Sequence, residues 1–221
     1  MQRIFDIIFS GIALVLLSPL FLPLMFILRV TGEGEIFFPQ CRVGRGRKHF
    51  KLYKFATMLK DSPNMATGTV TVKNDPRVLP MGGFLRKTKI NELPQLINII
   101  NGDMSLIGPR PQTQRCFNAF SLSSQNVIVK VRPGLSGIGS IVFRNEEEMM
   151  HANNDPDKFY DVIVMPYKGK LEEWYVRNLS IRLYFQLIFI TIYVVVFPRG
   201  KTVWAMLKKL PDPPKSLIKW L

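Results

Sequence analysis

The chain has 221 residues, and 30 lysines and arginines against 16 acidic residues give it a formal net charge of +14. This excess favours polyanionic partners: nucleic acid, anionic lipid or phosphorylated substrates. Hydrophobic residues make up 47% of the chain, which is more than a basic, soluble nucleic-acid binder usually carries. No pattern of alternating aromatic and basic residues suits base stacking either. The composition therefore argues against a nucleic-acid partner and for a protein that touches a membrane with a basic face.

Cysteine and histidine are too few for the sites that they usually build. Cys41 and Cys116 lie far apart in the sequence, and neither has a second cysteine nearby. His49 and His151 have no neighbours at metal-ligand spacing. A disulfide scaffold, a zinc site and a histidine-based catalytic triad are therefore disfavoured, and a reducing compartment is expected.

The first predicted element is an apolar helix over residues 7–28, which carry no charge. A straight helix of that length spans about 33 Å, close to the ~30 Å hydrocarbon core of a bilayer. Ser18-Pro19 and Pro23 lie in its middle, and each proline removes a backbone donor and bends a helix. Basic residues that begin with Arg29 favour a cytoplasmic C-terminal side. These residues leave two alternatives open, a transmembrane span and a re-entrant helix.

A basic hairpin is predicted next, with strands at residues 36–38 and 50–55 and a turn at residues 44–48. It is either a solvated hairpin or a surface that rests on anionic lipid headgroups, and we favour the second because it directly follows the membrane segment. A polar loop is expected over residues 61–75. The basic residues of the hairpin are Arg42, Arg45, Arg47, Lys48, Lys51 and Lys54.

The C-terminal part is apolar again. Residues 183–198 carry no charge and suit a buried helix or one lying in the membrane interface. Tryptophans and leucines alternate with lysines after it, as in interfacial anchors, in which lysines snorkel and tryptophans lie at headgroup depth. The residues of this predicted anchor are Trp204, Leu207, Leu210, Leu217, Ile218 and Trp220.

The densest chemical signal lies between residues 74 and 111. Asn91 and Glu92 precede an apolar helical run that ends before Gly102, so Asn91 suits an N-cap and Gly102 a C-terminal cap. Capping alone does not explain the arginines on either side, Arg86 and Arg110, of which the second stands between two prolines. A helix start, a carboxylate and converging arginines together suggest a pyrophosphate site with a divalent cation.

These residues carry a family resemblance. The chain resembles the monotopic bacterial sugar transferases, which are phosphoglycosyl transferases that start lipid-linked glycan synthesis. Several long motifs in order make a chance match very unlikely. They are Ser18-Pro19, Phe38 with Gln40, Arg42 and Gly44, Lys54-Phe55 with Thr57-Met58, Asn74-Asp75-Pro76-Arg77, Glu92-Leu93-Pro94-Gln95-Leu96, the run from Gly102 to Pro111, and the run from Arg132 to Gly137.

The resemblance implies an α+β, mostly helical, small membrane-associated domain with interfacial amphipathic helices. It divides the chain into a re-entrant membrane helix at 1–30 with its break at Ser18 and Pro19, a cytoplasmic sugar-transferase domain at 31–182, and a membrane-interface segment at 183–221. It implies transfer of a sugar phosphate, or of a sugar, from a nucleotide diphosphate sugar to polyprenyl phosphate. The resemblance also implies contact with membrane lipids, a location at the cytoplasmic face of the bacterial inner membrane, and Mg²⁺ as cofactor. It allows an oligomer.

Roles for individual residues follow from the resemblance. Asn91 and Glu92 are expected to be catalytic and to hold Mg²⁺, and Arg86 and Arg110 to bind phosphate. The loop around residues 132–137 is either a turn between two elements or a close approach to the nucleotide sugar, and the resemblance favours the second. The residues expected to bind the nucleotide sugar are Arg132, Pro133, Gly134, Ser136, Gly137 and Arg144.

The chain departs from the family at one decisive position. Asn91 stands where the family has the aspartate thought to be the nucleophile, and an amide is a poor nucleophile at phosphorus. Three readings follow: direct attack by the lipid phosphate with Glu92 and Mg²⁺ organising the site, replacement by another carboxylate such as Asp103 or residues 146–148, or binding without turnover. We favour direct attack, at phosphorus or at the anomeric carbon. Ala56 and Ser140 are smaller departures, where Arg and Gln are usual.

Overall fold

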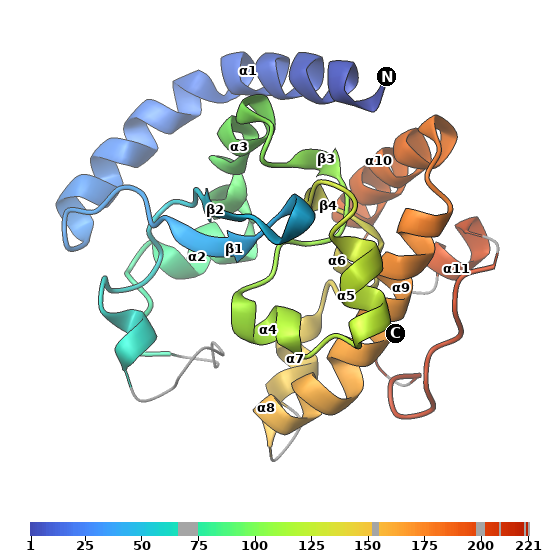
Figure 1. The fold of residues 1–221 in the computed structure, drawn as a ribbon. Coiled ribbons are helices and arrows are strands. Elements are labelled where there is room, and N and C mark those ends of the chain that lie inside the picture. The colour runs from blue at the N-terminus through green and yellow to red at the C-terminus, as the bar shows by residue number, and fades with distance from the viewer. Residues whose placement is uncertain (66–74, 152–154, 198–201, 208, 219, 221) are drawn as a thin grey trace.

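The computed structural model describes residues 1–65, 75–151, 155–197, 202–207, 209–218 and 220, and these are mostly helical with a few short strands (Figure 1). The helices are α1 (Gln2–Thr31), α2 (Gly82–Lys87), α3 (Gln95–Asn101), α4 (Gln114–Asn118), α5 (Leu122–Ile128), α6 (Ile138–Val142), α7 (Glu146–His151), α8 (Pro156–Phe159), α9 (Met165–Arg177), α10 (Ile181–Val196) and α11 (Thr202–Met206). The strands are β1 (Gln40–Val43), β2 (His49–Leu52), β3 (Ser105–Ile107) and β4 (Gly134–Ser136). Single turns precede three elements: η1 (Arg45–Arg47), η2 (Ser62–Asn64) and η3 (Ile90–Glu92), and η4 (Tyr160–Val164) joins α8 to α9.

Helix α1 curves over one side of the domain and is packed against it at both ends (Figure 1). Near its start, the buried Asp6 carboxylate accepts hydrogen bonds from Ser105 Oγ, the Leu106 backbone N–H and Tyr184 OH, at 2.9–3.0 Å. Near its end, Leu24 and Leu28 pack in a cluster with Phe55 and Leu85. Among the described residues, α1 is the one helix that is long and apolar enough to cross a membrane.

The prolines inside α1 bend the helix without interrupting it. Pro19 has no N–H to donate to the carbonyl of Val15, four residues earlier. The Ser18 hydroxyl donates to that carbonyl instead, at 2.8 Å. Ser18-Pro19 therefore provides a bend whose freed backbone acceptor stays satisfied, as a helix in an apolar environment requires.

The predicted hairpin is present, with its regular strands placed differently. β1 pairs antiparallel with β2, and residues 36–38 contribute only a single bridge, Phe37 to Phe55. The structure also divides the basic residues. Arg45, Arg47, Lys48 and Lys51 are exposed, whereas Arg42 and Lys54 line an internal cavity. The expectation of one lipid-facing basic surface is therefore wrong for these last two residues.

The second sheet joins two of the sequence motifs. β3 and β4 pair in parallel, which brings the run from Gly102 to Pro111 against the run from Arg132 to Gly137. A Cβ on Gly134 would lie 2.1 Å from the backbone nitrogen of Gly108, and one on Gly137 would lie 2.1 Å from the Gly108 carbonyl oxygen. These glycines are thus required for close packing of the two segments. This packing fits the alternative in which the loop is a turn between two elements.

The C-terminal leucines predicted to anchor the chain in the interface lie in the core. Leu207, Leu210 and Leu217 are at most 8% exposed and pack in one cluster with α6, α9 and α10. The lysines around them favour a membrane anchor in the sequence, but burying large apolar side chains in the domain removes their surface from water equally well. Of the predicted anchor, Ile218 is 57% exposed.

Candidate active site

Asn91 and Glu92 lie in η3, one turn before α3, not at the N-cap of a long helix. The chain enters this turn through Lys89, whose φ of 61° is uncommon for a residue with a side chain. Asn91 is 7% exposed, and its backbone carbonyl accepts from the Phe55 N–H at 3.0 Å. Its side-chain oxygen Oδ1 is buried and has no hydrogen-bond partner among the residues that the structure describes. An unsatisfied buried acceptor costs free energy, so this oxygen marks a place where a ligand is expected.

Glu92 is held by cations from two other elements. Arg110 donates to both carboxylate oxygens, at 2.5 and 3.2 Å, and Lys54 Nζ lies 3.9 Å from Oε1. Burial raises the pKa of Glu92, but Arg110 and Lys54 outweigh it and lower that pKa to about 2. Burial, together with Arg110, Arg42 and Arg86, lowers the pKa of Lys54 to about 7 despite the opposing effect of Glu92. Positive charge is thus crowded around one carboxylate.

Two cavities meet at these residues. We call the first the arginine cavity, because five arginines line its volume of about 360 Å³. They are Arg42, Arg77, Arg86, Arg110 and Arg115. We call the second, of about 540 Å³, the α10 cavity, because apolar residues of α6 and α10 line it. The residues that line both are Lys54, Arg86, Asn91, Arg110, Glu146 and Lys168.

The arginine cavity has a rigid wall on the side of Arg77. Its guanidinium donates to Asp75 through Nε and NH2, at 2.9 and 2.7 Å, and through NH1 to the Ser62 carbonyl. Both side chains are almost fully buried. Arg42, on the opposite strand β1, has its pKa lowered to about 10, first by burial and then by Arg110. A desolvated cavity with this much positive charge suits a ligand with several phosphate charges.

A second acidic group lies on the far side of Arg110. Glu172 of α9 is 1% exposed and accepts from the Arg110 backbone N–H at 3.4 Å, and burial raises its pKa to about 7. Glu146 lines both cavities but is held by Lys168 Nζ, at 2.8 and 3.0 Å. Of the carboxylates described around the cavities, Glu92 and Glu146 are therefore both already paired with cations.

The comparison with known families now decides the identity. The model of the family described as bacterial sugar transferase matches residues 1–198. The chain belongs to the bacterial sugar transferase family. It is 31% identical over 213 residues to the exopolysaccharide production protein ExoY of Sinorhizobium fredii, covering 90% of this chain and 87% of that protein.

A second relative has an activity in its name. The chain is 32% identical over 197 residues to the UDP-glucose:undecaprenyl-phosphate glucose-1-phosphate transferase of Klebsiella pneumoniae, which covers 87% of this chain but 39% of that longer protein. The ExoY protein of Rhizobium meliloti is 36% identical over 159 residues, covering 66% of this chain and 70% of the relative. This bacterial sugar transferase therefore matches both short and long members of its family.

The structure brings together part of the predicted site. Asn91, Arg86 and Arg110 line both cavities, and Glu92 lines the α10 cavity beside them. Ser136 and Arg144 also line the α10 cavity, where Arg144 NH1 donates to the Val194 carbonyl at 2.6 Å. The other predicted nucleotide-sugar residues lie elsewhere.

Arg132 lies in a third cavity, near the start of α1, and its Nε donates to the Gly102 carbonyl. Pro133 lines neither cavity at Asn91, and Gly134 and Gly137 pack against the backbone of Gly108, just after β3. The carboxylate Asp103, considered as a replacement nucleophile, accepts from Asn98 Nδ2 at 3.1 Å and also lines neither of those two cavities. Of the alternative carboxylates at residues 146–148, the structure describes the side chain of Glu146, which lies at the site but is already paired with Lys168.

The sequence alone does not show that Lys54, Arg42 and Lys168 line the cavities. Lys54 and Arg42 belong to the hairpin predicted to face lipid, because strand alternation does not tell which face of a short hairpin is covered. The family motifs that include both residues were the signal available. Lys168 lies in the first turn of α9 and is 1% exposed, and one lysine among the charged residues of a helix carries no such signal.

The residues predicted to hold Mg²⁺ do not fit that ion on their own. Mg²⁺ is usually bound through one or two carboxylates together with substrate phosphates. Both Glu92 oxygens already accept from Arg110, and of these two residues Asn91 alone has a side-chain oxygen without a partner among the described residues. No cluster of three acidic, histidine or cysteine side chains occurs among the described residues. A Mg²⁺ ion that arrives with the nucleotide sugar stays a prediction.

Proposed function

We propose that this bacterial sugar transferase moves a sugar phosphate from a nucleotide diphosphate sugar to polyprenyl phosphate at the cytoplasmic face of the inner membrane. The meeting of two cavities at Asn91 and Arg110 carries this proposal. The Klebsiella relative is named for transfer of glucose 1-phosphate from UDP-glucose to undecaprenyl phosphate. A relative from Salmonella typhimurium, 32% identical over 193 residues, is named undecaprenyl-phosphate galactose phosphotransferase.

We assign the nucleotide diphosphate sugar to the arginine cavity. A diphosphate brings at least two negative charges, and planar guanidinium groups bind such oxygens in pairs. Arg86 and Arg110 would hold the phosphate nearest the sugar, because both line the junction of the two cavities. Phe38 and Tyr160 also line this cavity and would bound the space for the base or the sugar.

We assign the polyprenyl phosphate to the α10 cavity. Its lining includes Ile141, Phe143, Val194 and Val195. Val195 is 59% exposed, so this lining continues into the uncovered apolar face of α10. A lipid could thus place its phosphate beside Arg110 while its chain leaves along α10. The exposed apolar residues of that helix face are Phe185, Phe189, Ile192, Val195 and Val196.

The reaction follows from this arrangement as one displacement. An oxygen of the polyprenyl phosphate attacks the phosphorus that carries the sugar, and the bond from that phosphorus to the nucleoside monophosphate breaks. The products are polyprenyl diphosphate sugar and nucleoside monophosphate, with no proton transfer required. Lys54 and Arg110 face the charge that develops on the phosphoryl oxygens, and preorganised cations contribute most in a desolvated site. Glu92 holds both cations in place.

The experiment for this function is transfer of doubly labelled nucleotide sugar to undecaprenyl phosphate in detergent. With ³H in the sugar and ³²P in the sugar-linked phosphate, we expect both labels in the lipid product with at least one of several nucleotide sugars. The sugar label without the phosphate label would instead show attack at the anomeric carbon. Binding of nucleotide sugars without either label in lipid would contradict the proposed transfer.

We propose that α1 enters the bilayer and returns to the side from which it came. Both ends of α1 contact the same domain: Gln2 Nε2 donates to Ser105 Oγ at 2.9 Å, and Leu28 packs beside Phe55. A straight span would separate its ends by the thickness of the bilayer, roughly 30 Å of hydrocarbon. Phe5 contacts Phe185 edge to face at 5.0 Å, which joins the exposed apolar faces of α1 and α10. That joined surface would face lipid.

Cysteine labelling tests this path. Gln2→Cys and Thr31→Cys should both react with a membrane-impermeant maleimide only after spheroplasts are lysed, because both ends are expected in the cytoplasm. Lys170→Cys, on the exposed side of α9, is the cytoplasmic reference. Labelling of either end in intact spheroplasts would show that α1 spans the bilayer. The natural Cys41 and Cys116 are replaced by serine in all variants.

A further inference from the structure

A third cavity, of about 220 Å³, lies where the start of α1 meets η1 and the chain between α5 and β4. We call it the N-terminal cavity. Four cations line it, Arg3, Arg45, Lys130 and Arg132, together with one carboxylate, Asp6. It shares no lining residue with the arginine cavity or the α10 cavity. The proposed transfer therefore gives it no role, and its charge calls for another explanation.

The one carboxylate does not neutralise this cavity. Asp6 is 2% exposed, and its Oδ1 atom accepts from three neutral donors. In the described part of the chain, none of the four cations forms a salt bridge. Four cations against one engaged carboxylate leave a strong positive field in a partly enclosed space.

Two of the arginines are held in position by the end of α3. Arg3 donates through NH1 to the Ile99 carbonyl and through NH2 to the Ile100 carbonyl, and Arg132 Nε donates to the Gly102 carbonyl at 2.8 Å. The Ile100 and Gly102 carbonyls, at and just after the end of α3, gain a partner in this way, and the Ile99 carbonyl, which also accepts from the Gly102 N–H at 3.0 Å, gains a second one. These bonds also leave the two terminal nitrogens of Arg132 without a described partner beside the cavity, and that planar pair fits two oxygens of a phosphate.

The border of the cavity is apolar and exposed. Leu179 lines it and is 42% exposed, and Ile4, next to Arg3, is 60% exposed. From Ile4 onward the outward face of α1 is apolar, so the cavity opens beside the surface that we assign to lipid. A soluble phosphate would gain no binding free energy from such a border. A phospholipid, in contrast, needs a charged pocket for its headgroup next to an apolar surface for its acyl chains.

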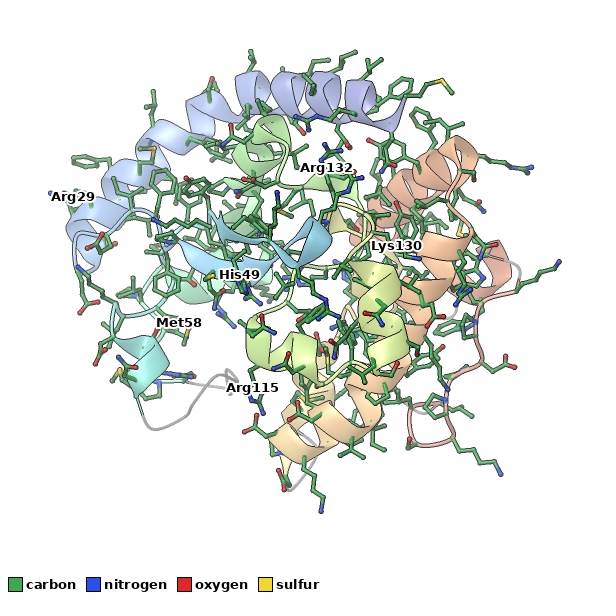
Figure 2. The ribbon with its side chains drawn as sticks, viewed as in Figure 1. Arg29, His49, Met58, Arg115, Lys130 and Arg132 are labelled. Carbon is green, nitrogen blue, oxygen red and sulfur yellow. The ribbon has the colours of Figure 1, made fainter. Side chains whose placement is uncertain are left out.

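We propose that the N-terminal cavity binds the phosphate group of an anionic glycerophospholipid, with Arg132 as the bidentate contact and Arg45 and Lys130 as supporting charges. The shared chemistry is a phosphate ester or free phosphate anion, and the apolar border favours the lipid as its source. Bound lipid would fix the start of α1 at headgroup depth. Figure 2 shows Arg132 and Lys130 toward the N-terminal half of α1 and Arg29 at the opposite end of that helix.

The test uses the full chain purified in detergent and given equal amounts of phosphatidylglycerol and phosphatidylcholine. Native mass spectrometry should show retained phosphatidylglycerol on the parent. The double variant Arg45→Ala/Lys130→Ala should retain about thirtyfold less, the fold-change that corresponds to roughly 1 kcal/mol for each of two cations near anionic lipid. Neither side chain bonds to another described residue, so the fold should be unchanged, which circular dichroism checks.

The control is Arg29→Ala, which removes one charge near the far end of α1, outside the cavity, and should retain phosphatidylglycerol like the parent. An equal loss per charge removed in Arg29→Ala and the double variant would overturn the proposal in favour of general surface charge. A second arm adds inorganic phosphate at constant ionic strength. Thermal stabilisation of the parent, but not of the double variant, without a preference for phosphatidylglycerol would support the site with a soluble source. No preference in either arm would refute it.

Discussion

Arg110→Ala should lower the rate of sugar transfer by about a hundredfold or more, the usual cost of removing one preorganised donor from a desolvated reaction centre. Arg110 lines both proposed substrate cavities and donates to both oxygens of Glu92. Its loss removes charge from the reacting phosphate and frees Glu92 to repel the same substrate. Steady-state transfer of labelled sugar phosphate to undecaprenyl phosphate measures the effect.

The control for this prediction is Arg177→Ala. Arg177 is also paired with a glutamate, Glu173, but its side chain is 65% exposed, and exposed pairs contribute little to stability. Its transfer rate should match that of the parent. Because a broken buried pair can destabilise a protein, thermal melts must accompany the assay, and Arg110→Lys retains the charge while losing the paired contact. Parent-like transfer by a folded Arg110→Ala chain would remove Arg110 from the mechanism.

A double variant separates the two roles considered for Glu92. If Glu92 acts by positioning Arg110, then Glu92→Ala combined with Arg110→Ala should be little slower than Arg110→Ala alone, because the two changes disrupt one unit. If Glu92 holds a metal ion or contacts substrate by itself, the losses should multiply. Glu92 is ionised throughout the neutral range, since its neighbours lower its pKa to about 2. A pH dependence near neutrality therefore would not come from its protonation.

Local patterns in the sequence predicted the elements around the site well. The glycine after an apolar run predicted the end of α3, and Gly102 does adopt a left-handed φ of 92° there. A two-strand hairpin was also predicted, because its basic turn is a local signal, but its first strand lies at residues 40–43 and not at residues 36–38. Asn91 was wrong as an N-cap: Pro94 follows so closely that the chain forms a separate turn, η3, before α3 begins.

Contacts between distant segments could not be predicted in the same way. Lys54 follows β2 and lies 3.9 Å from Glu92, a contact that depends on which face of this strand is covered. The alternation of side chains along a short strand does not show which face is covered. The buried leucines at the C-terminus show the same limit, because an amphipathic tail among lysines suits a membrane and a protein core equally. The family motifs located the site in the sequence. That Arg132 lies outside it, in a third cavity, is visible only in the packed structure.

Asn91→Asp should raise the transfer rate by no more than a few fold. The parent should transfer sugar phosphate without forming a phosphosugar adduct on the protein when nucleotide sugar is given alone. The reason is chemical: covalent catalysis needs an ionised oxygen, and the Asn91 amide has none. Under direct displacement a new carboxylate between the two cavities would repel the incoming lipid phosphate, which offsets any help that it gives as a nucleophile. Intact-protein mass spectrometry detects an adduct, and the transfer assay gives the rate.

The surroundings of the Asn91 side chain determine what each result would mean. Asn91 Oδ1 is buried and unpartnered beside Arg86 and Arg110, so an aspartate there would be ionised by its neighbours and available to react. An inactive parent together with a large gain and an adduct in Asn91→Asp would show a lost nucleophile. An adduct on the parent would point to Glu146, which lines both cavities. Asn126→Asp, on the exposed face of α5, makes the same chemical change away from the site and should leave the rate unchanged.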